Sequence, residues 1–181
     1  AALFPIAFKH AKPYEAYLKD IEEPKEPKKM AELFMKLTDT ALLTRIYKEY
    51  KETIARVLQV SAAGSPPAVD LVLLGMGPDG PTASLFPETR AMDETTRWVV
   101  SNEVPQLNTR RMTLTVPMIN AARSVIFLIA GEKKAGLLAE VLYGPRQPRQ
   151  LPSQRIAPVS GRLTWLIDEA ASRKLPAFIS E

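Results

Sequence analysis

The sequence VDLVLL at residues 69–74 runs directly into GMGPDGPTASLFP at residues 75–87. The first stretch is a short apolar run that ends at a glycine, as strands buried on both faces of a parallel sheet do. A second run of this kind, SVIFLIA, occupies residues 124–130. A helical pattern follows it over 133–143 and stops at Gly144, a residue that favours helix ends. Strand, glycine turn and helix in this order predict an α/β fold, with a parallel-type sheet flanked by helices.

Weaker signals complete this core. Further strands are expected at Trp98–Ser101 and around Met112–Val116. The segment Gly144–Pro158 contains four prolines and is expected to be an irregular surface loop. The stretch Arg162–Ser172 then ends the domain.

The first third of the chain has a different character, because it contains no glycine before Gly64. Residues 22–29 carry two prolines and mixed charge, which indicates a loop. Apolar residues, Ile46, Tyr50, Ile54 and Val57 among them, then recur at three- and four-residue steps and predict one or two amphipathic helices over roughly 28–59. We therefore expect an N-terminal helical segment, residues 1–60, packed on an α/β core, residues 61–181. A helix that binds a partner is the alternative interpretation of the same stripe.

Composition excludes several classes of function. The 181 residues suit one domain. There is no cysteine, and His10 is the only histidine, so sites that need Cys or several His ligands are excluded. The net charge of +4 is dispersed, which argues against nucleic-acid binding. No apolar run approaches the roughly 18 residues that span a bilayer, and no signal peptide is visible, so we expect no membrane association and a cytoplasmic location.

The glycine-rich loop after the first predicted strand is the candidate site, because ligands of open α/β sheets bind where strands end. Gly75, Gly77 and Gly80 allow backbone N–H groups to approach a ligand closely. Thr82 could cap a helical turn whose N-terminus attracts an anion. Asp79 offers a carboxylate for acid–base chemistry. A purely structural turn, with Asp79 in a local Asx hydrogen bond, is the alternative.

The stretch DLVLLGMGPDGPTASLFP resembles the signature of the 6-phosphogluconolactonase family, which is grouped with glucosamine-6-phosphate deaminase. Three later blocks resemble the same family in the same order and spacing: RMTLTVPMINAAR at 111–123, GEKKA at 131–135 with VLYGP at 141–145, and GRLTWLIDEAA at 161–171. The resemblance covers roughly residues 47–173. It extends over most of the chain, and we recognise no family block before it.

The resemblance implies hydrolysis of 6-phosphoglucono-δ-lactone to 6-phosphogluconate in the pentose phosphate pathway, without metal or cofactor. It assigns acid–base work to Asp79 and phosphate contacts to Arg111 and Lys134. Each of these two cations also has a plain interpretation as a solvated surface charge, beside Arg110 and Lys133 respectively. Isomerase or deaminase chemistry on the same fold is a less favoured alternative, since those relatives also use a histidine that is absent here.

Two departures from the family pattern lower the expected activity. The family histidine proposed as the catalytic base is replaced by Pro81, which can neither accept nor donate a proton. The family's N-terminal Ser-Gly-Gly and Asp-Glu-Arg motifs are absent, so the chain looks like the C-terminal two-thirds of the fold behind a helical segment of different origin. His10 is not assigned the missing role. We expect a weakened lactonase; a catalytically silent, truncated or engineered domain is the alternative. An incomplete sheet would leave an edge strand open, which predicts a homodimer.

Overall fold

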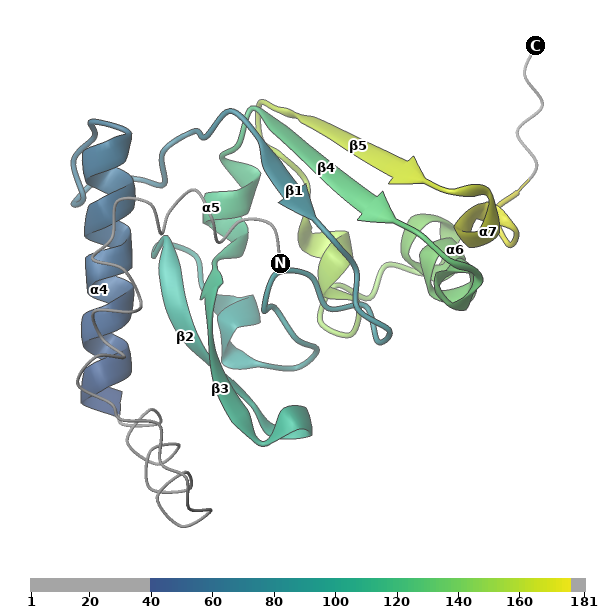
Figure 1. Ribbon diagram of the computed structural model, residues 1–181, viewed down its shortest axis with the longest axis horizontal. Coiled ribbons are helices and arrows are strands. Elements are labelled where there is room, and N and C mark those ends of the chain that lie inside the picture. Colours follow the sequence, from purple (N-terminus) through teal and green to yellow (C-terminus); the bar gives the residue numbers. More distant parts are fainter. Residues whose placement is uncertain (1–39, 177–181) are drawn as a thin grey trace, which may run out of the picture.

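The computed structural model describes residues 40–176, with side chains from Arg45 onward, and shows a parallel sheet beside a two-stranded hairpin (Figure 1). The parallel sheet has the order β1 (Val72–Leu74), β4 (Ser124–Ile129), β5 (Arg162–Ile167). The predicted α/β fold with a parallel sheet is thus confirmed. β1 is shorter than the expected stretch 69–74, because its pairing with β4 begins only at Val72.

Short helices cover one face of this sheet. They are α5 (Val116–Asn120), α6 (Ala135–Tyr143) and α7 (Glu169–Ser172). Short 3-10 turns lie at Arg90–Asp93, Pro105–Leu107, Glu132–Lys134 and Pro152–Arg155. Leu138 of α6 and Phe127 of β4 are fully buried in the core between sheet and helices. Phe127 stacks on Trp165 of β5 with ring centroids 4.0 Å apart, which ties the two strands together.

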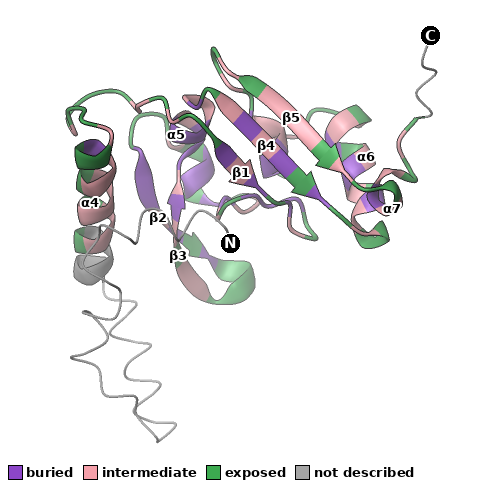
Figure 2. Ribbon diagram, turned by 45° about the horizontal axis from the view of Figure 1, so that its top comes forward, coloured by how far each residue is buried: buried purple, intermediate pink, exposed green. Residues whose placement is uncertain are grey.

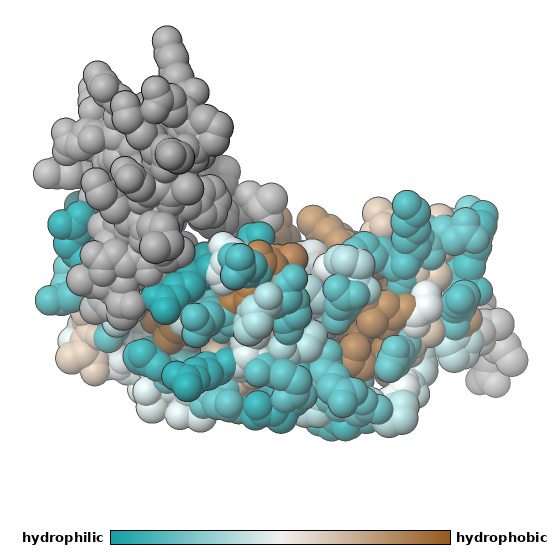
Figure 3. Space-filling model, turned by 90° about the horizontal axis from the view of Figure 1, so that it is seen from below, coloured by the Kyte–Doolittle hydropathy of each residue, from teal (hydrophilic) through white to brown (hydrophobic). Residues whose placement is uncertain are grey.

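The opposite face of the parallel sheet is open in the described part of the chain. Leu71, Leu128 and Leu166 lie on this face with 47%, 50% and 52% of their surface exposed. Figure 2 shows the sheet turned towards the viewer with no described helix in front of it. The molecule seen from below is mainly hydrophilic, with apolar residues in separate patches (Figure 3). Parallel sheets normally have both faces covered, so this open face is unusual.

The two strands expected near residues 98–101 and 112–116 form an antiparallel hairpin outside the parallel sheet. They are β2 (Val99–Val104) and β3 (Thr109–Leu114). The second strand ends earlier than expected, because Thr115 caps α5: its side chain accepts a hydrogen bond from the Met118 amide. Pro117 favours the first turn of this helix, so Val116 is helical rather than extended.

The N-terminal helical segment is represented by α4 (Thr40–Val57), which packs on the hairpin. Tyr50 and Ile54 contact the cluster around the buried Trp98, so this part of the amphipathic stripe packs on the rest of the protein. Val57, predicted to belong to the stripe, is instead half exposed. The part of the predicted helix before residue 40 lies outside the described residues. Among those described, no helix combines the length and apolar character needed to cross a bilayer.

The segment Gly144–Pro158 is irregular, as expected, apart from its 3-10 turn, but the expectation of a surface loop is wrong for its centre. Leu151 and Ser153 are buried. The Ser153 hydroxyl donates to the Gly80 carbonyl at 3.0 Å. This segment therefore packs against the glycine-rich loop and supports it. Its proline content predicts irregular structure but not burial.

Glu94 is the most strongly perturbed acid among the described residues. Its side chain, 8% exposed, accepts hydrogen bonds from the backbone amides of Thr95, Thr96 and Arg97 and from the Arg97 guanidinium. Burial raises the pKa of Glu94, but these hydrogen bonds together outweigh it and lower the pKa to about 2. The ionised side chain thus fixes the turn that leads into β2.

Replacing Glu94 with glutamine should lower the free energy of unfolding at pH 7. Because the folded-state pKa is depressed, ionised Glu94 stabilises the fold above pH 4.5, and this contribution disappears as the pH falls towards 2. Urea unfolding of Glu94→Gln and of the unsubstituted chain between pH 2 and 7 measures the difference in the free energy of unfolding. This difference should shrink as the pH falls from 4.5 towards 2. Glu103→Gln, at an exposed ion pair, is the control and should cost less than about 1 kcal/mol. A difference independent of pH would contradict the assignment.

Candidate active site

The loop that follows β1 is closed by its own backbone. The Gly77 amide donates to the Pro81 carbonyl at 2.7 Å, and the Gly80 amide donates to the Gly77 carbonyl at 3.3 Å. A Cβ on Gly77 would lie 2.5 Å from the ring of Pro81, so no larger residue fits there. Gly80 has φ +82°, a conformation that glycine adopts without strain. These two glycines therefore shape the loop that carries Asp79.

This loop forms one wall of a cavity of about 500 Å³. Asp79 is exposed and lines the cavity, and it accepts no hydrogen bond from the described residues. The buried Pro81 lines the same cavity, as do Gly75 and Gly77. The structure therefore brings the predicted carboxylate and the position of the missing histidine to one wall.

Two predicted site residues help to shape the loop itself. Gly80 is buried against Leu151 and does not line the cavity. Thr82 lines it, but the prediction that Thr82 caps a helix is wrong, because no helix follows it. Its buried hydroxyl donates to the Gly75 carbonyl at 2.9 Å and ties the two ends of the loop together. The anion site expected at a helix N-terminus is therefore not formed here.

The two predicted cations lie beside the loop. Lys134, at the turn after β4, donates from Nζ to the Met76 carbonyl at 2.8 Å. This bond joins the ends of two neighbouring parallel strands. The exposed Arg111 on β3 stands over the ring of Phe86, with Cζ 6.0 Å from the ring centroid. Phe86 lines the cavity and Arg111 does not, so Arg111 lies at the rim of the cavity.

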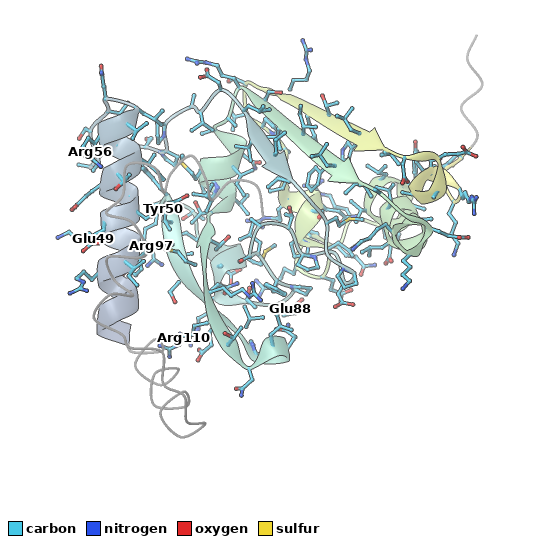
Figure 4. The ribbon with its side chains drawn as sticks, viewed as in Figure 1. Glu49, Tyr50, Arg56, Glu88, Arg97 and Arg110 are labelled. Carbon is cyan, nitrogen blue, oxygen red and sulfur yellow. The ribbon has the colours of Figure 1, made fainter. Side chains whose placement is uncertain are left out.

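The remaining walls come from elements that sequence reasoning did not connect with the site. Met112, Thr113 and Leu114 of β3 line the cavity, and so does Tyr50 of α4. Figure 4 shows Tyr50 on the side of α4 that faces the hairpin. Tyr50 was predicted only as part of an apolar helical stripe. In the sequence, only its hydroxyl group could have indicated that Tyr50 belongs to a binding site. A single hydroxyl in an apolar stripe is too weak a signal for that prediction.

A second hollow, of about 550 Å³, lies beside α5 and is lined by Pro117 and Asn120 among others. It contains none of the predicted site residues, so the smaller cavity is the candidate site. No group of His, Asp or Glu side chains within residues 40–176 is arranged to hold a metal ion. His10 lies outside the described residues.

Comparison with protein families gives a match over most of the chain. The family described as glucosamine-6-phosphate isomerases/6-phosphogluconolactonase matches residues 12–165. This match reaches well before residue 47, where the resemblance in the sequence analysis began. The expectation that the N-terminal helical segment has a different origin is therefore wrong from residue 12 onward.

Similar curated proteins and solved structures agree with this match. The chain is 45% identical over 127 residues to a 6-phosphogluconolactonase of Synechocystis sp., covering 70% of this chain and 51% of that protein. It is 41% identical over 130 residues to the human 6-phosphogluconolactonase, covering 71% and 50%. A 6-phosphogluconolactonase structure from Trypanosoma brucei matches with a TM-score of 0.64 and 28% identity, covering 77% of this chain and 56% of that one.

The chain spans about half the length of the curated relatives it matches. The family match nevertheless covers most of the present sequence, and it includes α4, the glycine-rich loop and the strands of the parallel sheet. The chain therefore belongs to the glucosamine-6-phosphate isomerase/6-phosphogluconolactonase family.

Proposed function

We propose that this chain hydrolyses 6-phosphoglucono-δ-lactone to 6-phosphogluconate, at a rate that Pro81 keeps low. The observation that carries the proposal is the exposed Asp79 carboxylate on the cavity wall at the end of β1. Relatives at 41–45% identity named 6-phosphogluconolactonase support the same reaction. The cytoplasmic location expected from the sequence stays a prediction.

In the proposed reaction, Asp79 accepts a proton from a water molecule whose oxygen attacks the lactone carbonyl carbon. The tetrahedral intermediate then breaks the bond between that carbon and the ring oxygen. The ring oxygen takes up the proton that Asp79 holds, which leaves Asp79 ionised again. One water is consumed, and the product is the open-chain acid.

The substrate phosphate is assigned to the two cations beside the loop. Lys134 uses one of its three N–H donors on the Met76 carbonyl, so two remain for phosphate oxygens. Arg111 presents a planar guanidinium at the cavity rim, a geometry suited to bidentate phosphate binding. Lys134 lies in the turn after β4 and Arg111 lies on β3, and between them they would fix the phosphorylated end of the ligand relative to Asp79.

Asp79→Asn should reduce the enzymatic rate by about 10²–10⁴-fold, because asparagine cannot accept the proton from water. The side chain is exposed and makes no hydrogen bond to the described residues, so folding should be unaffected. Decay of freshly prepared lactone measures the rate. Asp70→Asn, at an exposed ion pair with Arg123 before β1, is the matched control and should keep the rate. An Asp79→Asn rate equal to that of the unsubstituted chain would exclude Asp79 as the base.

We also propose that two copies associate through the open face of the parallel sheet. This face is apolar, with Leu71, Leu128 and Leu166 exposed on it. In addition, the outer strands β1 and β5 each have one edge without a partner strand among the described residues. Sedimentation at micromolar concentration should show a dimer, and Leu128→Lys should shift it to a monomer. Val159→Lys, at an 85% exposed residue outside the strands of the sheet, should leave the dimer intact. A monomeric unsubstituted chain would contradict this proposal.

A further inference from the structure

Tyr50 lies where the N-terminal helix meets the cavity. It is in the third turn of α4, and it packs against the cluster that contains Trp98 and Val99. It also lines the cavity that Asp79 lines. Packing therefore holds the Tyr50 ring in place without help from its hydroxyl.

The Tyr50 hydroxyl makes no hydrogen bond within residues 40–176, although a half-buried tyrosine hydroxyl normally finds a partner. It is not sealed in the core either, since Asn102 Oδ1 is the one fully buried side-chain atom without a partner among the described residues. The hydroxyl therefore keeps some exposed surface, and Tyr50 lines the cavity. Burial raises the pKa of Tyr50, so the phenol stays protonated and can both donate and accept.

The surroundings make this hydroxyl distinctive. Leu73 and Leu114, which line the cavity with Tyr50, are apolar. The hydroxyls of Thr82 and Thr113 already donate to backbone carbonyls. Of the hydroxyl side chains that line the cavity, only those of Tyr50 and Ser84 do not donate to a described residue. A ligand bearing hydroxyl groups can thus be held at the α4 wall through Tyr50.

We propose that Tyr50 is a substrate-binding residue whose hydroxyl hydrogen-bonds a hydroxyl of the sugar-acid chain. This proposal rests on the proposed function and adds a specificity contact from α4. The sugar hydroxyl takes no part in the bond changes at the carbonyl carbon, so the contact is made equally in the ground state and the transition state. It should therefore affect KM rather than kcat.

The test compares Tyr50→Phe with Tyr47→Phe. Tyr47 is on the same helix and packs on the same cluster but does not line the cavity. Calorimetric titration with 6-phosphogluconate should show affinity reduced roughly 3- to 10-fold in Tyr50→Phe, the effect of one neutral hydrogen bond, and unchanged in Tyr47→Phe. KM for the lactone should rise by a similar factor with kcat unchanged. Thermal unfolding of the free protein should be the same for Tyr50→Phe and the unsubstituted chain.

Three results would overturn the proposal. Equal affinity of Tyr50→Phe and the unsubstituted chain would exclude the contact and leave the proposed function standing. A lower unfolding temperature for Tyr50→Phe would show that the hydroxyl serves the fold. Absence of 6-phosphogluconate binding to the unsubstituted chain would overturn this proposal together with the proposed function.

Discussion

Pro81→His should raise the lactonase rate of this chain by about 10²–10⁴-fold, the contribution of a positioned general base. The side chain at position 81 lines the cavity that Asp79 also lines, so an imidazole there would be within the site. Proline supplies no group that transfers a proton. The rate is followed as the decay of fresh lactone above its spontaneous hydrolysis.

The control for this substitution is Pro81→Ala. Both variants lose the ring that packs on Gly77 and gain a backbone N–H, so they share these two changes to the fold. Only the histidine adds an imidazole, and the rate difference between the two variants isolates it. If Pro81→His folds and binds 6-phosphogluconate but is no faster than Pro81→Ala, Pro81 is not the main reason for low activity.

Trp98→Ala should lower the free energy of unfolding by about 3–5 kcal/mol, the range for deleting a large aromatic side chain from a core. Trp98 is fully buried between α4 and the hairpin. Its Nε1 donates to the Gly64 carbonyl at 3.1 Å, and the Lys51 ammonium lies 5.1 Å from its ring centroid. The substitution therefore removes the main contact that holds α4 in place.

Urea unfolding monitored by circular dichroism measures this loss. Trp98→Phe keeps most of the buried ring and should cost less, because it gives up mainly the hydrogen bond to Gly64. Trp98→Ala should also weaken 6-phosphogluconate binding more than Tyr50→Phe does, since the α4 wall of the cavity depends on Trp98. A loss below about 1 kcal/mol, the size of a typical single substitution, would show that α4 docks by other contacts.

Sequence patterns predicted β1 and β4 of the parallel sheet but not β5, because a continuous apolar run followed by glycine is a local property that only the first two strands show. The run 124–130 corresponds to β4 within one residue. The same patterns predicted two strands near Trp98 and Met112 but not that these strands pair with each other in a separate hairpin. Pairing depends on the partner strand, which a single strand's sequence does not encode.

The candidate site was predictable only where its residues are close in the chain. Asp79, Gly75 and Gly77 follow a strand end, so their place at the cavity could be expected. Thr82 fits the sequence pattern of a helix cap, but its hydroxyl bonds to Gly75, a contact set by how the loop folds. Tyr50 reaches the cavity only because α4 packs on the hairpin, and no local pattern marks that.

The most direct test of the central claim is the lactonase assay of the unsubstituted chain. Freshly generated 6-phosphoglucono-δ-lactone is added, and its decay is compared with the spontaneous background and with Asp79→Asn. The account predicts slow hydrolysis above background that Asp79→Asn abolishes. Decay equal to the background would contradict it, and would mean that this member of the family has kept the fold without the chemistry.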